Sequence, residues 1–427
     1  MPREMKESGV DWIGVIPKNW GTSIVRNCLV EINDSNNPIK TTNVLSLTNK
    51  LGVVPYEEKG NQGNKSKENY SGYKLAYENT IVANSMNVLI GSVGISNYYG
   101  CVSPVYYVFK AKDNVDLRYI NYLFQNAGFQ KELRKYAKGI MEIRLRVSSR
   151  DIMHRTIPLP NRSMQKSISD YLDKECKRID RVITDTERSI EEYKKLKQSI
   201  ITEAVTKGVR GHNREMKDSD IKWIGQIPKE WRVDKIKYVS EIGPNCKNVS
   251  DDSVVTYTPM ENIKSGYFID NAVPKHKVPA SLTPYEEGDI VLAKVTPCFE
   301  NMNIAIMNSL SSGVGYGSSE LFVLRPKKVD TDYLFYWLQN YYFMDMGVAT
   351  MTGVGGLKRV SPYYVKNSFI LLPPKTEQRE IAGYLKKRIR SLDDAVRLKE
   401  RFAKELEDYK KSIIYEYVTG KKEVPEQ

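Results

Sequence analysis

The chain has 427 residues, 41% hydrophobic and 27% charged, with a formal net charge of +13. This length gives room for two or three domains. The positive balance favours a polyanionic partner, nucleic acid before an anionic membrane, and the alternative is a basic soluble protein without one. The five cysteines form no C-x-x-C pair. We find no signal peptide and no run of roughly 18–20 apolar residues, so we expect a cytoplasmic protein without disulfides, structural zinc or membrane segments.

A sixteen-residue segment near the N-terminus occurs twice. Residues 5–20 read MKESGVDWIGVIPKNW and residues 216–231 read MKDSDIKWIGQIPKEW, with ten identical positions. This identity indicates a tandem duplication with a unit of 211–213 residues. Because aromatic side chains contribute much of the buried surface, we expect Trp12, Trp20 and their counterparts to be core anchors.

The body of each repeat is predicted to be mostly β. Short apolar runs between clusters of Gly, Asn and Ser predict strands at 43–47, 80–83, 88–90, 104–109 and 140–160, and at 257–260, 288–293 and 320–324 in the second repeat. Helical spacing of apolar residues predicts one helix over 117–136 and a counterpart at 333–340. The bodies share these landmarks and diverge between them. We therefore expect two copies of one fold that bind different targets through their loops.

A long helical segment follows each body, from Ser163 to Val205 and from Thr376 to Val418, and the two align without a gap at an offset of 213. Apolar residues at heptad a and d positions predict a coiled coil of these segments with each other. The alternative is two separate amphipathic helices on local cores. Lysines interrupt the seam at Lys197, Lys399 and Lys410. The predicted seam residues are Leu172, Cys176, Ile179, Ile183, Thr186, Ile190, Tyr193 and Ile200, with Leu385, Ile389, Leu392, Val396, Ala403, Leu406 and Ile413.

Chain geometry predicts the direction of the second helix. About 44 residues at roughly 1.5 Å each give a rod of about 65 Å, whereas the linker from Lys207 to Glu215 spans at most about 30 Å. The second repeat must therefore start near the end of the first helix, and its own helix runs back. We predict an α+β fold in which two mostly β recognition domains with some helix are joined by two long helices. These helices form an antiparallel coiled coil, and the whole is a pseudo-twofold tandem repeat.

The predicted boundaries follow from these segments. They are 1–160 for the first recognition domain, 161–207 for the first helix, 208–215 for a linker, 216–373 for the second recognition domain, 374–420 for the second helix and 421–427 for a tail.

The sequence shows no catalytic constellation. Gly60-x-x-Gly63-x-Lys65-Ser66 lacks the glycine spacing of a phosphate-binding loop, and Gly313-x-Gly315-x-Gly317 lacks that of a dinucleotide fingerprint. Neither Ser361-Pro362-Tyr363-Tyr364 nor Leu372-Pro373-Pro374-Lys375 matches the tetrapeptide that holds the target amino group in adenine N6-methyltransferases. The three histidines are too dispersed for a metal site or a triad. We therefore expect no catalytic residue, metal or cofactor in this chain.

The repeated segment W-I-G-x-I-P-x-x-W, at Trp12–Trp20 and Trp223–Trp231, and the run Leu372-Pro373-Pro374-Lys375-Thr376-Glu377-Gln378 resemble the specificity (S) subunit of type I restriction-modification systems. The resemblance covers essentially the whole chain, as two variable target recognition domains that alternate with two conserved helical regions. The first copy departs from the family's Leu-Pro-x-x-x-Glu-Gln pattern with Met164 in place of Glu. This departure predicts a looser start of the first helix.

The resemblance implies a non-catalytic subunit that binds a split sequence in double-stranded DNA. Each recognition domain would bind one half-site, and the coiled coil would set the spacer. It also implies two modification (M) subunits that carry S-adenosylmethionine and methylate adenine N6 after base flipping. Restriction (R) subunits would use ATP and Mg²⁺ for translocation and cleavage.

Polar and basic loop residues are the candidate DNA contacts, because side chains such as Asn, Ser, Thr and Arg read base edges, whereas phosphate contacts only position a protein. The alternative for each is a solvated loop residue and, for tyrosine, core packing. In the first domain the candidates are Asn84, Ser85, Asn87, Ser96, Asn97, Tyr98, Arg144 and Arg146, with Lys65 and Lys67 as phosphate contacts. In the second they are Lys294, Thr296, Asn301, Asn303, Lys358 and Arg359.

Two functions of other classes compete with this interpretation. A methyltransferase or nuclease whose motifs have drifted would transfer methyl groups as the purified chain alone. A coiled-coil adaptor that binds protein would retain no DNA sequence-selectively, even beside modification subunits.

Overall fold

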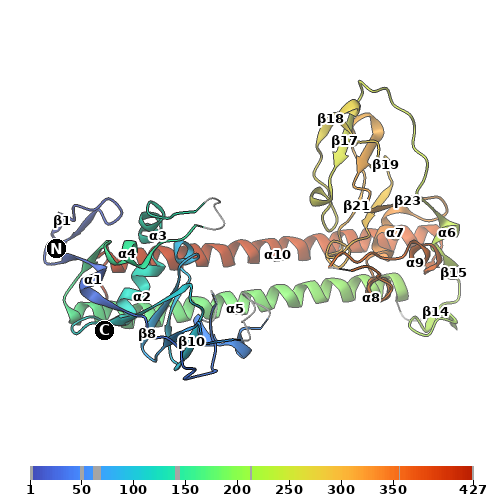
Figure 1. Ribbon diagram of the computed structural model, residues 1–427. Helices are drawn as coiled ribbons and strands as arrows, with labels where there is room; N and C mark the ends of the chain where they lie inside the picture. The colour runs from blue at the N-terminus through green and yellow to red at the C-terminus, as the bar shows by residue number, and fades with distance from the viewer. Residues whose placement is uncertain are drawn as a thin grey trace. The chain divides into compact units, whose positions relative to one another are not determined.

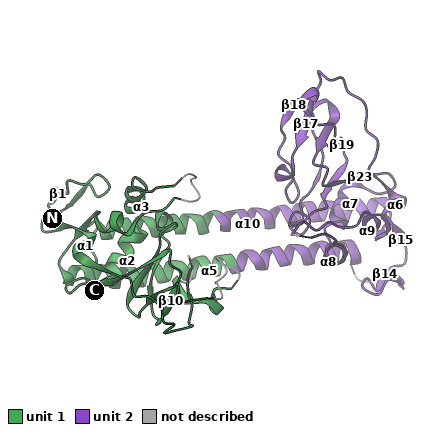
Figure 2. Ribbon diagram, in the orientation of Figure 1, with its two compact units in different colours: residues 1–187, 401–427 green, residues 188–400 purple. Residues whose placement is uncertain are grey.

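The computed structural model describes residues 3–48, 52–60, 69–139, 145–211, 214–354 and 356–425. The chain forms two compact units, residues 1–187 with 401–427 (unit 1) and residues 188–400 (unit 2), as Figure 2 shows. Both boundaries fall inside the long helices α5 (Arg162–Lys207) and α10 (Lys375–Val418). Each unit therefore contains one β-rich domain and a part of both helices.

The two units repeat one order of elements (Figure 1). In unit 1 these are β1 (Met5–Glu7), β2 (Val15–Pro17), β3 (Gly21–Ile24), α1 (Val25–Cys28), β4 (Leu29–Ile32), β8 (Thr80–Asn84), β9 (Val93–Ser96), β11 (Tyr106–Ala111), α2 (Leu117–Gln125), α3 (Ala127–Arg134), α4 (Ser149–Met153) and β12 (Thr156–Leu159). Their counterparts in unit 2 are β13 (Met216–Asp218), β14 (Gln226–Pro228), β15 (Arg232–Lys235), α6 (Ile236–Val239), β16 (Ser240–Ile242), β20 (Ile290–Ala293), β21 (Ile304–Ile306), β23 (Leu321–Pro326), α7 (Thr331–Trp337), α8 (Tyr341–Ala349), α9 (Pro362–Asn367) and β24 (Phe369–Leu372).

One four-stranded antiparallel sheet is common to both units. Its order is β4-β11-β8-β9 in unit 1 and β16-β23-β20-β21 in unit 2, and the last strand before each long helix pairs with β3 or β15. The register is also shared, since Tyr106 faces Asn84 in unit 1 and Leu321 faces Ala293 in unit 2. The duplication seen in the sequence is therefore a duplication of the fold.

The strands inserted into this frame differ between the units. Unit 1 has two sheets of two strands each, β5-β6 and β10-β7. They are made of β5 (Leu45–Thr48), β6 (Gly52–Pro55), β7 (Lys74–Ala76) and β10 (Gly100–Val102). Unit 2 has a four-stranded sheet, β18-β17-β22-β19, made of β17 (Val254–Thr258), β18 (Ala272–Pro274), β19 (Thr283–Glu286) and β22 (Val314–Gly317). Short 3₁₀ helices lie at η1 (Tyr56–Lys59), η2 (Val88–Ile90), η4 (Met260–Asn262), η5 (Lys275–Lys277) and η6 (Ser311–Gly313).

Three local predictions were wrong. The helix expected over 117–136 is two helices, because Asn126 is extended (φ −72°, ψ 125°) and its side chain accepts the N–H groups of Gly128 and Phe129 as the N-cap of α3. The strand expected at 88–90 is the 3₁₀ helix η2. Within 140–160, residues 149–153 form α4, whose N-cap is Ser148.

In each unit α5 and α10 pack against each other and run antiparallel. In unit 1, Lys410 pairs with Asp180 at 2.7 Å, and the ring of Tyr171 lies 4.5 Å from that of Tyr417. In unit 2, Lys197 pairs with Asp393 at 2.7 Å. The two ion pairs are equivalent at the repeat offset, so these lysines of the apolar seam meet an acidic partner across it. The predicted α+β class and antiparallel pairing are confirmed.

The predicted seam residues turn inward. Those that are buried are Leu172, Cys176, Ile179, Thr186, Ile190, Leu385, Ile389, Leu392 and Ile413, and those that are half-buried are Ile183, Tyr193, Ile200, Val396, Ala403 and Leu406. The core of unit 1 contains Trp20 and Tyr119 with Ile168 of α5 and Val418 of α10, and the core of unit 2 is built in the same way. Among the described residues, no helix has the length and apolar content that crossing a membrane requires.

Candidate nucleic-acid interface

Four of the predicted DNA contacts of unit 2 meet where β20 ends. The N–H of Lys294, the first residue after β20, donates to the carbonyl of Glu320 at 3.0 Å, and its carbonyl accepts from Val360 at 2.8 Å. The hydroxyl of Thr296 accepts the N–H of Lys358 at 3.0 Å and donates to the carbonyl of Gly356 at 2.6 Å. These bonds fix the base of the loop that carries Lys358 and Arg359, so Lys294, Thr296, Lys358 and Arg359 form one cluster.

Arg359 is held on both its backbone and its side chain. Its N–H and carbonyl both bond to Thr352, at 2.8 and 3.1 Å. Its Nε and Nη2 donate to the two carboxylate oxygens of Glu320, each at 2.9 Å. The hydrogen bonds and positive charge of Arg359, together with the charge of Lys294, lower the pKa of Glu320 from its ordinary value. Glu320 is therefore a carboxylate at neutral pH.

Unit 1 has the same backbone arrangement after β8. We call this arrangement, in which the residue after the central strand bonds to the neighbouring strand and to the loop that carries the arginine, the joint of each unit. The N–H of Ser85 donates to the carbonyl of Val105 at 3.3 Å, and its carbonyl accepts from Val147 at 3.1 Å. Arg146 exchanges both backbone bonds with Lys138, at 2.8 and 2.9 Å. Ser85, Val105 and Arg146 thus stand where Lys294, Glu320 and Arg359 stand in unit 2. Within the described part of the chain, the exposed guanidinium of Arg146 has no hydrogen-bond or ion-pair partner.

The remaining predicted contacts lie in several places. Asn84 and Ser85 are buried, and the side chain of Asn84 accepts the N–H of Met86 at 3.0 Å, whereas Asn87 is exposed. In unit 2, Asn301 is exposed, and the carbonyl of the half-buried Asn303 accepts the N–H of Ala293 at 2.9 Å, beside the cluster.

Ser96, Asn97 and Tyr98 are not brought to this joint. Ser96 pairs with Thr80, at the opposite end of β8 from Asn84. The side chain of Ser96 is fully buried and donates to the carbonyl of Tyr98 at 2.9 Å, while Asn97 is exposed and Tyr98 is half-buried. Lys65, Lys67 and Arg144 lie outside the described residues.

Among the joint residues that were not predicted, two are charged, Glu320 and Lys138. Glu320 precedes its partner Arg359 by 39 positions, and no local pattern connects them. The repeat offset could have helped to find them, because it aligns Arg146 with Arg359. It thereby marks these two arginines as equivalent residues whose binding partners should be compared.

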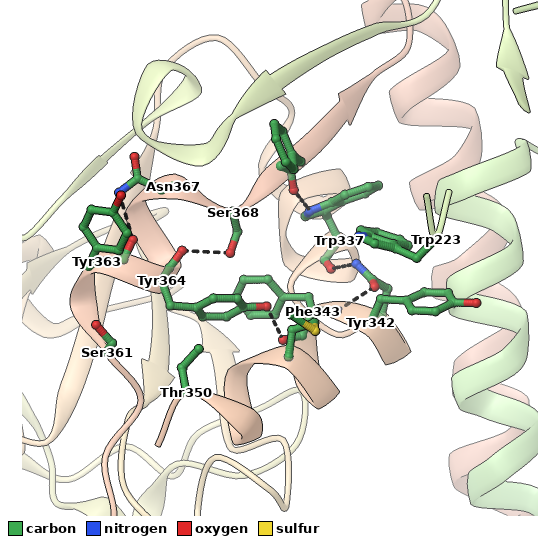
Figure 3. Close-up of a pocket in the computed structure, with 13 residues that line it drawn as sticks. Trp223, Trp337, Tyr342, Phe343, Thr350, Ser361, Tyr363, Tyr364, Asn367 and Ser368 are labelled. Carbon is green, nitrogen blue, oxygen red and sulfur yellow. Dashed lines mark hydrogen bonds between the residues drawn. The ribbon is translucent and has the colours of Figure 1, made fainter. Parts of the chain in front are cut away.

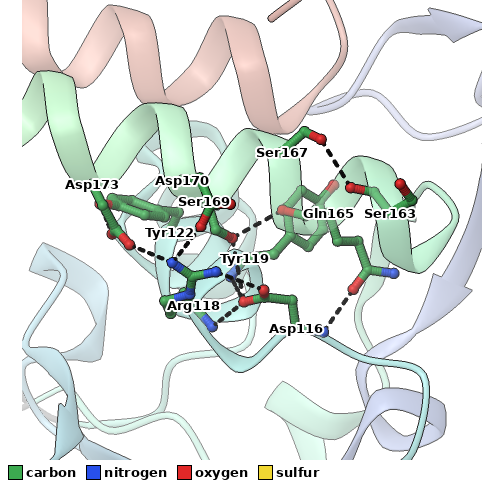
Figure 4. Close-up of polar contacts among 10 residues, drawn as sticks. All are labelled: Asp116, Arg118, Tyr119, Tyr122, Ser163, Gln165, Ser167, Ser169, Asp170 and Asp173. Carbon is green, nitrogen blue, oxygen red and sulfur yellow. Dashed lines mark hydrogen bonds and ion pairs between the residues drawn. The ribbon is translucent and has the colours of Figure 1, made fainter. Parts of the chain in front are cut away.

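A polar cluster attaches the domain of unit 1 to α5 (Figure 4). Asp116 is the N-cap of α2, and its own N–H donates to Gln165 Oε1 at 2.9 Å, while Gln165 Nε2 donates to the carbonyl of Pro160 at 2.8 Å. Arg118 pairs with Asp170 and Asp173 at 2.8 and 2.7 Å. Gln378 of unit 2 repeats both bonds of Gln165, with Asp330 and Pro373, each at 2.8 Å.

A buried tyrosine in each unit contacts the last strand of the domain and the end of one long helix. The hydroxyl of Tyr119 lies 3.0 Å from the carbonyl of Pro158, next to the start of α5, and 2.9 Å from that of Val418 at the end of α10. Tyr333 does the same with Leu371 at 3.0 Å and with Val205 at 3.3 Å. Each tyrosine thus bonds to the last strand of its own domain and to the end of the other long helix.

Unit 2 also contains an aromatic pocket of about 470 Å³ (Figure 3). Trp223, Trp337, Tyr342, Phe343 and Tyr364 line it, and Trp223 stacks on Tyr342 at 4.4 Å. Polar groups at its wall bond within the protein, since Tyr364 donates to the carbonyl of Phe343 at 2.6 Å and Ser368 to that of Tyr364 at 2.8 Å.

Larger polar side chains stand at two corresponding positions of unit 1. Arg155 takes the position of Ser368 and lies 3.5 Å from the ring centroid of Tyr136, which takes that of Thr350. Trp12, the counterpart of Trp223, packs on Phe129 at 5.4 Å and donates to the carbonyl of Thr156 at 3.3 Å. Within the described residues, Arg155 and Tyr136 of unit 1 thus stand where Ser368 and Thr350 line the pocket of unit 2.

Comparisons with known proteins agree with the duplicated architecture. Residues 28–192 and 228–408 each match the family described as "Type I restriction modification DNA specificity domain". The "Type I restriction enzyme EcoEI specificity subunit" of Escherichia coli is 33% identical over 167 residues, which are 38% of this chain and 28% of that one. The "Putative type I restriction enzyme MjaX specificity subunit" of Methanocaldococcus jannaschii is 27% identical over 316 residues, 73% of this chain and 69% of that one.

A solved structure shares the fold. It is described as "Structural basis underlying complex assembly and conformational transition of the type I R-M system" and superposes with a TM-score of 0.68 over 94% of this chain and 98% of that chain, at 14% identity.

Proposed function

Because the chain belongs to the type I restriction-modification DNA specificity family, we propose that it selects the DNA sequence on which a type I complex acts. The observation that supports this most is the pair of joints after β8 and β20. They have one backbone arrangement, and each presents an arginine from a loop stem, but the side chains around that arginine differ. Two modules with one frame and unlike contact groups are what a two-part DNA target requires.

Each unit recognises one half of this target. Arg146 and Asn87 contact the half-site of unit 1, and the cluster of Lys294, Thr296, Lys358 and Arg359 contacts that of unit 2. Lys65, Lys67 and Arg144 keep their predicted roles. The net charge of +13 favours binding to the phosphate backbone, so affinity falls steeply with added salt.

The chemistry belongs to partner subunits. M subunits with S-adenosylmethionine methylate adenine N6, and R subunits with ATP and Mg²⁺ cleave, while this chain is a non-catalytic subunit of a cytoplasmic complex. The paired helices set the spacer between the half-sites.

The test is co-expression with an M subunit that carries the Asn-Pro-Pro-Tyr/Phe motif, followed by mapping of N6-methyladenine in the host DNA. We expect one motif with two defined halves and a spacer of constant length. Arg146→Ala should change the first half alone, and Lys358→Ala with Arg359→Ala the second alone.

The result that rejects the proposal is an undivided motif, or none with an M subunit shown to bind this chain. Purified chain with S-adenosylmethionine but without M serves as the control for the drifted-enzyme alternative, and methyl transfer by this sample would favour an enzyme. Equal retention of specific and scrambled DNA by the joint complex would favour the adaptor.

A further inference from the structure

One difference between the joints of the two units lies at the position that supplies the carboxylate to Arg359 in unit 2. In unit 2, Glu320 supplies a carboxylate to Arg359, whereas Val105 occupies the same place in unit 1. The carbonyl of each residue accepts the N–H of the residue after the central strand, Lys294 or Ser85, which fixes the equivalence through the backbone. The side chains of Arg359 and Glu320 are 48% and 28% exposed, so the pair can be reached by a ligand.

The pair presents different hydrogen-bonding groups from a free arginine. Arg359 uses Nε and Nη2 on Glu320, which leaves the N–H groups of Nη1 as donors and the unused lone pairs of the carboxylate as acceptors next to them. Arg146 keeps all its donors, within the described part of the chain. A free guanidinium matches the two acceptors of guanine, O6 and N7, whereas a carboxylate accepts from the amino group of cytosine or adenine.

We propose that Glu320 is a specificity-determining residue of unit 2: with Arg359 it forms a donor and acceptor pair that reads a base edge bearing an amino group. This inference rests on the proposed function. Arg146, without such a partner, reads guanine in the other half-site. The carboxylate also opposes approach of a phosphate to Arg359, since like charges repel, so the pair favours base contact over backbone contact.

A reciprocal exchange of the two residues tests this. Glu320→Val gives unit 2 the side chain of unit 1, and Val105→Glu gives unit 1 the carboxylate. We expect Glu320→Val to change one position of the half-site of unit 2, from adenine or cytosine towards guanine. Val105→Glu should weaken the preference for guanine at one position of the half-site of unit 1. Each change should shift discrimination at that position by roughly 5- to 150-fold.

The readout is the N6-methyladenine motif of each complex, with binding competition between duplexes that differ at the one position. Glu320→Gln is the second variant, because it keeps the shape of the side chain and removes its charge. Amide hydrogen exchange of residues 352–360 shows whether the loop base is intact in each variant.

The inference is overturned if the variants keep the parental motif and discrimination, which would make the pair an ordinary surface ion pair. It is equally overturned if binding changes by one factor for every sequence, which would make Glu320 a general electrostatic modulator. The complex of the unaltered chain distinguishes a failure of this inference from a failure of the proposed function. If it yields no two-part motif, the proposed function fails, whereas a two-part motif with neutral variants rejects the inference alone.

Discussion

Trp20 and Trp231 are equivalent residues, yet their indole N–H groups differ in partner. Trp231 donates to the fully buried Glu377 at 3.1 Å, and Arg214 donates to both oxygens of Glu377 at 2.5 and 3.0 Å. In unit 1 the position of Glu377 is taken by Met164, and the buried Nε1 of Trp20 has no partner among the described residues. The departure of Met164 from the family pattern therefore removes a hydrogen-bond acceptor from the core.

Restoring an acceptor should stabilise unit 1. We expect Met164→Gln to stabilise it by about 1 kcal/mol, because a buried donor without a partner gains one. Slower amide hydrogen exchange in residues 15–24 would show this stabilisation.

The opposite change in unit 2 is the control. Glu377→Met leaves both Arg214 and Trp231 without their acceptor and should cost about 3–5 kcal/mol, seen as faster exchange in residues 226–235. Unchanged exchange in Met164→Gln would show that the orphaned indole costs nothing.

At the scale of single residues, the sequence predicts where contacts gather better than which atoms they present. The repeat offset marks Arg146 and Arg359 correctly as counterparts at one structural joint. It does not reveal that Glu320 forms an ion pair with Arg359, because this contact depends on the register of β20 and β23. The burial of Ser96 has the same origin, since its inward direction is fixed by its pairing with Thr80.

At the scale of elements, Tyr119 and Tyr333 each link the last strand of their domain to the end of one long helix. Tyr119→Phe removes the single hydroxyl proton that the carbonyls of Pro158 and Val418 share and should destabilise unit 1 by about 1–3 kcal/mol. The local effect should be faster exchange in residues 413–419, with residues 375–400 of the same helix unchanged.

Tyr122→Phe is the matched control, because its hydroxyl donates to Asp173, on α5, at 2.7 Å and, among the described residues, bonds to no group of α10. If both variants accelerate the end of α10 equally, the attachment by Tyr119 is not specific.

The seam in unit 1 should be sensitive to alkaline pH. Burial raises the pKa of the Cys176 thiol from its ordinary 9.0 to about 11. The folded state favours the neutral thiol, so this contribution is complete below pH 9 and is lost as the pH rises through about 11. It amounts to at most about 2–3 kcal/mol.

The measurement is the free energy of unfolding of unit 1 between pH 8 and 11, compared with Cys176→Val. The variant should lose less stability over this range than the parent does. Parallel curves would show that the thiol takes no part.

The heptad pattern predicts the long helices well because their length repeats one periodic signal many times. Helix 117–136 was predicted as one element for the same reason, since its apolar spacing continues across Asn126. The break there depends on a side chain that caps the next helix, an interaction that periodicity does not register. Two of the three lysines in the seam are explained by the antiparallel register, which places Asp393 opposite Lys197 and Asp180 opposite Lys410.

At the scale of the whole molecule, the boundaries of the units cut across single helices. We therefore expect α10 to open in two parts. Residues 401–418 should exchange with the free energy of unit 1, and residues 375–400 with that of unit 2. Variants that destabilise one unit give the measurement: Glu377→Met should accelerate the first part of α10, and Tyr119→Phe the second. One uniform change along α10 would contradict this division.

The division of the chain also bears on its synthesis. Unit 2 is one continuous stretch, residues 188–400, whereas unit 1 needs residues 401–427, among them Ile413 and Val418 of its core and the carbonyl that Tyr119 binds. Domains usually fold in the order in which they leave the ribosome. Here the domain that emerges first keeps apolar surface exposed until residues 401–427 have been made. Unit 2, which emerges later, can complete its core before unit 1 does. We therefore expect the nascent N-terminal domain to need chaperones more than the second domain does.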